Sequence, residues 1–400
     1  MANVLFIGYP AQGHINPTLG LTRELVRRGE KVTYFCVDEY KEMIERTGAE
    51  YRSMGITIES RKRKRNINAS IFDKFEYRLT WMDQSIEHVM RNVTDECYDY
   101  VIHDAQSLHG HIISKMLRTP SISTWTTFSY NVNSSNWIMS KDELDAIHLP
   151  YQFKNKLHHF GNKHNYPIKS LQDLYLYSSD LHIVFTSKQF QYESETFDDT
   201  YKFVGPSIIE REDRLEMLPF KDLNNKKIIY ISMGTILSLE PEIFQMCIEA
   251  FKDLDVYVIV SDKNLSARND IEIPSNFFVY RHVPQLEVLN YCNVFITHCG
   301  MNSTNEGLYF NTPLVMIPSV NDQHMVAQRV EQAGAGIRLE KNKLSSSQIK
   351  SAVLEVMHNP LYKLNCEHIG RSLREAGGFV RAADEISKFK KLFLYRYDGV

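Results

Sequence analysis

The sequence predicts an α/β protein built from two Rossmann-like, doubly wound domains that face each other across a central cleft. Short apolar runs rich in β-branched residues alternate with segments of helical periodicity, which is typical of parallel sheets covered by helices. The runs form two series, one in each half of the 400 residues. A chain of this length is long enough to build two separate cores.

Each expected strand is a short apolar run that ends at a turn or a polar segment. In the first half, these runs are residues 4–8, 31–37, 100–103, 120–124 and 181–186. In the second half, they are residues 227–232, 256–260, 277–280, 294–297 and 313–317.

The charged stretch 205–225 contains Pro206 and no clear periodicity, so we expect it to separate the two domains. The expected N-terminal domain covers residues 1–210 and is followed by a C-terminal domain over 211–380. We expect the tail 381–400 to form a helix that packs back on the N-terminal domain. Its apolar positions at helical spacing are Ile386, Phe389, Leu392 and Phe393.

Composition excludes several classes of partner. The formal net charge of −3 gives no reason to expect nucleic acid, and we interpret the basic run 61–65 as a solvated loop. The six cysteines lack CxxC spacing, which argues against a disulfide framework or a zinc ribbon. The N-terminal apolar run is too short for a signal peptide, and no run is long enough to span a membrane. We therefore expect a cytoplasmic protein with no membrane span.

Residues 8–17 connect the first expected strand to the first helix. Asn16 is expected to cap this helix, with Pro17 as its first residue and Gly29 just past its end. The segment lacks the Lys-Ser/Thr pair of a P-loop and contains no GxGxxG, so neither nucleotide-binding motif is supported. What remains is His14 at the carboxyl end of a strand, where open α/β sheets place their chemistry.

His14 is a candidate general base, because an imidazole with a pKa of about 6.5 can take a proton from an alcohol at neutral pH. The alternative is that His14 only caps the turn. Asp104 closes another expected strand. If that strand neighbours the first, its carboxylate could bond to His14, fix its tautomer and stabilise the imidazolium. The alternative for Asp104 is a solvated loop residue.

The most informative stretch is 297–307, in which a strand stops at a His-x-Gly turn and continues as a helix. The backbone N–H groups and the partial positive charge at the start of such a helix suit a diphosphate. Asn302 and Ser303 can cap the helix or donate to phosphate oxygens. Glu306, one turn later, is placed to accept from sugar hydroxyls. The stretch therefore predicts a site for a nucleotide diphosphate.

Together these residues resemble the family 1 UDP-dependent glycosyltransferases of GT-B fold, and among them the bacterial macrolide and flavonoid glycosyltransferases. The resemblance covers nearly the whole chain and implies that the domain 1–210 binds the acceptor and the domain 211–380 binds the nucleotide-sugar donor. It is strongest in the ordered set formed by residues 283–289, the His298-x-Gly-x-Asn-Ser-Thr-x-Glu306 motif and the Asp322-Gln323 pair. It implies inverting transfer of a hexose from a UDP-sugar to a hydroxyl of a small hydrophobic acceptor, giving a β-glycoside. Gln323 at the end of the motif suggests glucose by this resemblance.

The resemblance also implies a role for each matched residue. His14 and Asp104 would form the catalytic dyad. The backbone of Val283 and the amide of Gln285 would hold the uracil, beside His282, where plant relatives carry a stacked tryptophan. Because histidine stacks over less area and some relatives use thymidine diphosphate sugars, the nucleotide stays open between UDP and TDP.

The remaining roles concern the ribose, the diphosphate and the sugar. Glu306 would bind the ribose hydroxyls, and Asp322 and Gln323 the sugar hydroxyls. The residues expected around the diphosphate are His298, Gly300, Asn302 and Ser303, together with Gly234 and Thr235 in a small-residue turn after another strand.

Two patterns suggest a metal, and neither is convincing. Residues 253–255 have the DxD form used by metal-dependent glycosyltransferases of another fold, but we interpret them as a solvated turn. His103, His109 and His111 do not match a zinc pattern. We expect no metal and no cofactor, with the UDP-sugar as co-substrate.

Aromatic residues of the first half are candidates for an acceptor pocket, although any one such residue is more often ordinary core. The candidates are Phe72, Trp81, Trp125 and Phe128. We expect a monomer, because a cleft between domains must open and close. Two other functions remain open: a nucleotide-sugar epimerase of the same fold, and a non-catalytic nucleotide-sugar-binding partner protein.

Overall fold

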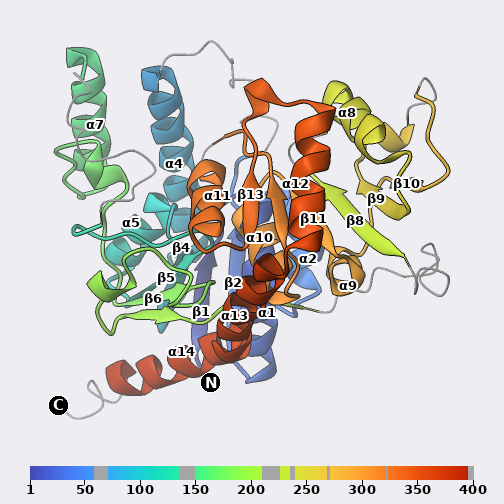
Figure 1. Ribbon diagram of the computed structural model, residues 1–400. Helices are drawn as coiled ribbons and strands as arrows, with labels where there is room; N and C mark the ends of the chain where they lie inside the picture. The colour runs from blue at the N-terminus through green and yellow to red at the C-terminus, as the bar shows by residue number, and fades with distance from the viewer. Residues whose placement is uncertain are drawn as a thin grey trace. The chain divides into compact units, whose positions relative to one another are not determined.

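The computed structural model describes residues 1–57, 71–134, 149–209, 226–234, 239–267, 271–320 and 322–394 (Figure 1). The basic run 61–65 and most of the stretch 205–225 lie outside these ranges. The chain divides into two compact units. Unit 1 comprises Met1–Phe185, Gln191–Ser207 and Gly377–Val400, and unit 2 comprises Thr186–Phe190 and Ile208–Ala376.

Unit 1 is built on a seven-stranded parallel sheet in the order β3-β2-β1-β4-β5-β6-β7. Its strands are almost continuously buried, as expected for a parallel sheet covered on both faces. The strands are β1 (Asn3–Ile7), β2 (Lys31–Cys36), β3 (Glu50–Ser53), β4 (Tyr100–Asp104), β5 (Ser121–Trp125), β6 (Leu181–Val184) and β7 (Tyr201–Phe203). The α-helices are α1 (Gln12–Arg27), α2 (Lys41–Glu45), α4 (Ile71–Val93), α5 (Leu108–Leu117), α7 (Tyr151–Lys163) and α14 (Gly378–Leu394).

Unit 2 repeats this architecture with a six-stranded parallel sheet in the order β10-β9-β8-β11-β12-β13 (Figure 1). Its strands are β8 (Lys227–Ser232), β9 (Val256–Ser261), β10 (Phe277–Tyr280), β11 (Val294–Thr297), β12 (Leu314–Met316) and β13 (Gly336–Arg338). Its α-helices are α8 (Pro241–Phe251), α9 (Gln285–Tyr291), α10 (Met301–Tyr309), α11 (Gln323–Gln332), α12 (Ser346–His358) and α13 (Pro360–Glu375). In the described ranges, no helix combines the length and the apolar character needed to cross a bilayer.

The prediction of two doubly wound α/β domains is confirmed, and every expected strand is present. Three strands were not expected: β3, β7 and β13. All three lie at the edges of their sheets. Edge strands contact one neighbour only, so they carry a shorter and more polar pattern than interior strands.

The predicted start of the first helix is wrong. α1 begins at Gln12 with Ala11 as its N-cap, so Asn16 is not the cap and Pro17 lies inside the helix. The carbonyl of Ala11 already accepts the amides of His14 (2.9 Å) and Ile15 (3.1 Å), which starts the helical ladder before the proline is reached. Pro17 is the sixth residue of α1 and has no amide hydrogen, so the helix lacks the ladder bond that would run from residue 17 to the carbonyl of Gly13.

The helix α14 packs against α1 within unit 1, as predicted, but it starts at Gly378 instead of residue 381. Ile386 and Phe389 are buried, whereas Leu392 is 65% exposed and does not belong to the packed face. Gly20 allows α14 to approach α1 closely. A Cβ at position 20 would lie 2.6 Å from Oγ of Ser207 and 2.9 Å from the ring of Phe379, which belongs to α14.

A charge network joins the same two helices. The Glu24 carboxylate accepts from the guanidinium groups of Arg27 and Arg28, each at 2.7 Å, and Arg28 also contacts Asp384 of α14 at 2.7 Å. The hydrogen bond from Arg27 is the largest influence on the pKa of Glu24 and, with Arg28, lowers it to about 2 against the opposing effect of burial. The lowered pKa keeps Glu24 ionised over the whole neutral range, where it holds the Arg28 guanidinium that also contacts Asp384 of α14.

His103, His111 and His182 are among the imidazoles buried in unit 1. His103 contacts Oγ of Ser179 at 3.1 Å, and His182 contacts Oγ of Ser123 at 2.6 Å. Burial lowers the pKa of His103 and His182 to about 4 and that of His111 to about 2. All three are therefore neutral in the folded protein at pH 7.

We predict that Gly20→Ala destabilises unit 1 by about 1–3 kcal/mol, because the added methyl overlaps Ser207 and Phe379. Urea unfolding of the variant measures this loss. Adding Ser207→Gly and Phe379→Ala to Gly20→Ala removes the overlapping atoms, so the triple variant should lose less than the sum of the separate changes. Additive losses would contradict the packing argument.

We also predict that stability falls as the pH drops from 6.5 towards 4. In the unfolded chain, histidines become protonated near pH 6.5, whereas the folded protein keeps His103, His111 and His182 neutral at that pH. Their contribution to the free energy of unfolding is therefore complete above pH 6.5 and is lost progressively as the pH falls below it. Each neutral imidazole contributes a slope of about 1.4 kcal/mol per pH unit. Urea unfolding at several pH values should show a smaller slope for His182→Gln than for wild type, and equal slopes would contradict the prediction.

Candidate active site

The order of both sheets reverses at their centre, and ligands of open α/β sheets bind at such a reversal, beyond the carboxyl ends of the strands. In unit 1, the reversal lies between β1 and β4, which pair in parallel with Ile7 opposite His103. His14 follows β1 in the first turn of α1, and Asp104 is the last residue of β4. The sequence predicted a contact between these two residues if their strands were neighbours, and the two strands are neighbours.

His14 and Asp104 form a hydrogen-bonded pair. Nδ1 of His14 lies 2.8 Å from Oδ2 of Asp104, and their side chains are 18% and 3% exposed. The other carboxylate oxygen accepts the amide of Gln106 at 2.7 Å, so the carboxylate is fixed at both oxygens. Because Nδ1 is directed at Asp104, Nε2 is the ring nitrogen that can exchange a proton with a substrate.

Two neighbours of His14 were not predicted. Oγ1 of Thr126 lies 3.0 Å from Nδ1 of His14, and the ring of Tyr9 lies 4.6 Å from the imidazole between ring centroids. Thr126 directly follows β5, which pairs with β4. The rule that indicated Asp104, a polar residue at the carboxyl end of a strand, could have found Thr126 as well.

The predicted acceptor residues do not gather at one place. Trp81 is buried and lies 6.2 Å from the ring of Tyr9, which makes a series of rings from Trp81 through Tyr9 to His14. Phe72 packs on Phe153 and Phe128 on Tyr192. Trp125 belongs to a separate small core of unit 1 with Ala105, Tyr130, Val184, Phe197 and Phe203.

In unit 2, the sheet order reverses between β8 and β11. Gly234 follows β8, with φ of 82°, and His298 follows β11. A Cβ on Gly234 would lie 2.6 Å from Cε1 of His298, and one on Gly300 would lie 2.6 Å from its Nε2. The imidazole thus fits between two glycines, and only glycines leave room for it.

His298 is neutral and poorly hydrated. Burial lowers its pKa to about 4, and its buried Nδ1 has no hydrogen-bond partner among the described residues. An unpaired buried nitrogen is costly, and such atoms are found where a ligand or an ion supplies the missing partner.

The turn between β11 and α10 is strained. Cys299 adopts φ of 67°, a left-handed conformation that is rare for residues other than glycine, and its amide donates to Oγ1 of Thr297 at 3.3 Å. Gly300 is the N-cap of α10 and provides no side-chain cap. The first amides of the helix, including those of Asn302 and Ser303, have no intrahelical acceptor and suit an anion.

Beside this turn, three predicted residues form one hydrogen-bonded group. Nε2 of Gln285 donates to Oε2 of Glu306 at 2.6 Å and to Oγ of Ser303 at 3.3 Å. The hydroxyl of Tyr230, which sequence reasoning missed, donates to the other end of the Gln285 amide at 3.1 Å. The neighbouring Val283 is buried and His282 is exposed.

The two predicted sugar-binding residues lie at the start of α11. Asp322 is its N-cap, and Gln323 is its first residue. The side-chain carbonyl of Gln323 accepts the amides of Ser319 (2.9 Å) and Val320 (3.1 Å), so its Nε2 is the end able to donate to a ligand. Thr235 lies outside the described residues.

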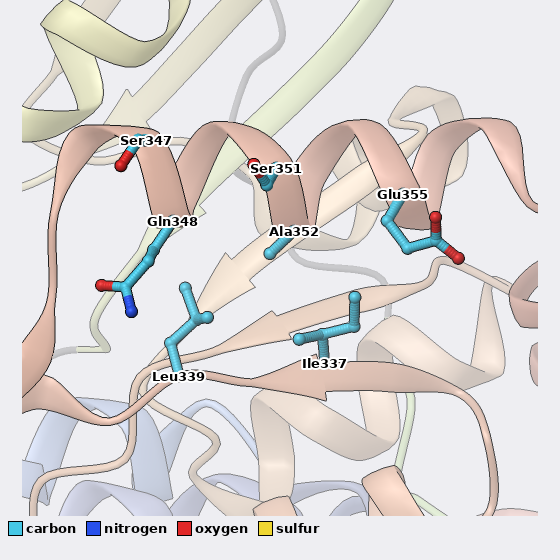
Figure 2. Close-up of a pocket in the computed structure, with 7 residues that line it drawn as sticks. All are labelled: Ile337, Leu339, Ser347, Gln348, Ser351, Ala352 and Glu355. Atoms are coloured by element: carbon cyan, nitrogen blue, oxygen red, sulfur yellow. The ribbon is translucent and has the colours of Figure 1, made fainter.

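No group of three or more potential metal ligands occurs in the described part of the chain. Residues 253–255 form a turn between α8 and β9, where Asp255 pairs with Lys226 at 2.8 Å. Figure 2 shows an apolar groove in which Ile337 and Leu339 point towards α12. It contains none of the predicted site residues.

Comparisons with known proteins agree with this geometry. Residues 178–374 match the family model described as UDP-glucoronosyl and UDP-glucosyl transferase. The chain is 40% identical over 393 residues to the uncharacterized UDP-glucosyltransferase YojK of Bacillus subtilis, covering 96% of this chain and 97% of that protein. It is 33% identical to the NDP-glycosyltransferase YjiC of the same organism, covering 97% of each. Among solved structures, the calicheamicin glycosyltransferase CalG4 superposes with a TM-score of 0.83 at 22% identity, over 97% of this chain and 98% of that one.

We predict that Gly300→Ala weakens the binding of UDP by about tenfold or more, equivalent to ~1.4 kcal/mol. Gly300 has φ of −64°, which alanine adopts readily, so the effect would come from the displaced His298 ring and not from backbone strain. Isothermal titration calorimetry with UDP measures the change. The control Gly29→Ala places a methyl in open space at φ of 86° and should cost stability without changing UDP affinity. Unchanged UDP binding by Gly300→Ala would contradict the assigned site.

Proposed function

This chain belongs to the UDP-glucoronosyl and UDP-glucosyl transferase family and is a glycosyltransferase, and we propose that it transfers glucose from UDP-glucose to a hydroxyl of a small hydrophobic acceptor such as a macrolide or a flavonoid. The transfer would invert the anomeric centre and give a β-glycoside. The observation that carries the proposal is the His14–Asp104 pair at the reversal of the first sheet.

In the proposed mechanism, Nε2 of His14 takes the proton of the acceptor hydroxyl as its oxygen attacks the anomeric carbon. Asp104 stabilises the imidazolium that forms, and its fixed carboxylate keeps the imidazole oriented. Thr126 contacts the same ring nitrogen and restricts its rotation. The bond from the anomeric carbon to the diphosphate breaks, and UDP leaves.

The leaving diphosphate would be stabilised by the first amides of α10 and by His298. A neutral imidazole carries one N–H, which can donate to a phosphate oxygen where a buried nitrogen now lacks a partner. Helix amides stabilise negative charge without reorganisation at the moment of reaction. The proposal therefore requires no metal and no cofactor, with the UDP-sugar as co-substrate.

The nucleoside and the sugar would bind on either side of this turn. The group formed by Gln285, Ser303 and Glu306 presents amide and carboxylate atoms for the base and the ribose hydroxyls. Asp322 and Nε2 of Gln323 would bind the sugar hydroxyls. The exposed His282 ring is available to stack on the base.

The ring series from Trp81 through Tyr9 to His14 supports a flat, hydrophobic acceptor. Aromatic side chains bind such molecules by stacking and by burying apolar area. All six cysteines are free, which supports a reducing cytoplasm as the compartment.

We predict that His14→Ala lowers kcat about 10²–10⁴-fold, the usual contribution of a general base. UDP-glucose is supplied with a panel of phenolic and macrolide acceptors, and free UDP and product mass are measured. The control is His158→Ala, which changes an exposed histidine of α7. Near wild-type turnover by His14→Ala would refute the assignment of the base. Epimerised UDP-sugar without acceptor would favour an epimerase, and binding without turnover of any acceptor would favour a non-catalytic protein.

A further inference from the structure

One cation of unit 1 has an unusual environment. Arg78 lies on α4, partly buried, and its Nη2 donates to the backbone carbonyl of Gln106 at 2.9 Å. Its guanidinium carbon lies 4.7 Å from the ring centroid of Tyr175. Its Nε is buried and has no hydrogen-bond partner among the described residues.

Among the described residues, no carboxylate forms an ion pair with Arg78, and its neighbours include the phenol side chains of Tyr175, Tyr9, Tyr177 and Tyr130. Buried arginines are normally paired with an acid, because desolvating the guanidinium is costly. Here a carbonyl bond and a cation–π contact compensate for part of that cost. The simplest explanation for a guanidinium buried at such a cost is that it has a role beyond general packing.

The carbonyl that Arg78 binds belongs to the loop that follows β4. In this loop, the Gln106 amide donates to Oδ1 of Asp104 at 2.7 Å, and the Ala105 amide donates to the carbonyl of Thr124 at 2.9 Å. The hydroxyl of Tyr177 donates to the carbonyl of Ala105. The carbonyls of Ala105 and Gln106 therefore each accept a hydrogen bond from a side chain in a distant part of unit 1.

We propose that Arg78 is a positioning residue for the dyad: by holding the carbonyl of Gln106 it restrains the backbone at that residue, so that the Gln106 amide, which lies in the preceding peptide unit, keeps the Asp104 carboxylate fixed against His14. This inference rests on the proposed roles of His14 and Asp104. The series of contacts runs from Arg78 to the Gln106 carbonyl, from the Gln106 amide to Asp104, and from Asp104 to Nδ1 of His14.

The contact series explains why a side chain on α4 affects the reaction without touching it. The Gln106 carbonyl and the Gln106 amide belong to successive peptide units joined at the Cα of Gln106. Release of the carbonyl lets the loop backbone shift at this Cα, and the shift withdraws the amide from Oδ1 of Asp104. The carboxylate is then held by His14 alone and can adopt other rotamers. Small losses of alignment in a reacting pair reduce kcat more than they reduce substrate binding.

The test compares Arg78→Met, Arg78→Lys and the control Arg91→Met in the full-length enzyme. Methionine keeps the apolar stem but removes the donors, whereas lysine keeps one charged donor for the carbonyl. Arg91 lies on the same helix with a 74% exposed side chain. Arg78→Met should lower kcat about tenfold with the KM for UDP-glucose nearly unchanged. Arg78→Lys should recover most of the loss, and Arg91→Met should behave as wild type.

A double-mutant cycle separates positioning from a general effect on stability. In an Asp104→Ala background, Arg78→Met should reduce kcat by less than about twofold, because there is no carboxylate left to position. A full tenfold loss in that background would overturn the inference. So would a selective rise in the KM for acceptors, which would place Arg78 in contact with the acceptor.

The same data distinguish the inference from the proposed function. If His14→Ala and Asp104→Ala retain wild-type turnover, the proposed dyad is wrong and the inference fails with it. If both lose turnover while Arg78→Met keeps wild-type kcat, the proposed function stands and only the role of Arg78 is refuted.

Discussion

The reversal of strand order at the centre of each sheet is the constraint on which the rest of the site depends. Helices that leave neighbouring strands in opposite directions leave the carboxyl ends of the two central strands uncovered. In unit 1 this opening lies beyond β1 and β4 and exposes the His14–Asp104 pair. In unit 2 it lies beyond β8 and β11 and exposes the Gly234, His298 and Gly300 turn. The two units use one topology for two kinds of chemistry, because only the side chains at the strand ends differ.

The two openings differ in how their polar groups are supported. The imidazole of His14 has a carboxylate partner that can stabilise its charged form, as a base requires. The imidazole of His298 has no such partner, and burial lowers its pKa to about 4, which keeps it as a neutral donor. Under the roles that we propose, the same residue type accepts a proton in one unit and donates a hydrogen bond in the other.

Much of this arrangement could be predicted from the sequence, for identifiable physical reasons. The interior strands are buried on both faces and therefore carry the continuous apolar runs that the sequence shows plainly. The edge strands β3 and β7 are half-exposed and polar, so their pattern could not be distinguished from that of loops. The contact between His14 and Asp104 could be predicted because Asp104 ends one interior strand and His14 closely follows another. Most of the donor motif could be predicted because its residues fall in one stretch, 282–323.

Other parts of the site depend on contacts that no local pattern encodes. Thr126 and Arg78 become neighbours of the dyad or its loop only when β5 pairs with β4 and α4 packs on α5. Tyr230 looks like a core residue of β8, and only its hydroxyl reaches Gln285. The start of α1 was misplaced because the helical ladder begins at Ala11, where the sequence has no capping side chain, and continues past Pro17. The structure thus adds the residues that support the dyad to those that the sequence could identify.

The path of the chain has a consequence for recombination between relatives. Unit 1 is assembled from three separate stretches, and its last stretch, Gly377–Val400, returns to it after unit 2 has been completed. A chimaera joined at a single crossover near residue 208 would therefore carry a foreign α14 against the native α1, with a mismatched partner for Gly20 and Arg28. Two crossovers, near residues 208 and 376, would exchange most of unit 2 as a cassette and keep α1 and α14 from one parent. Shuffling of nucleotide-sugar specificity in this architecture should accordingly proceed by internal replacement and not by exchange of chain halves.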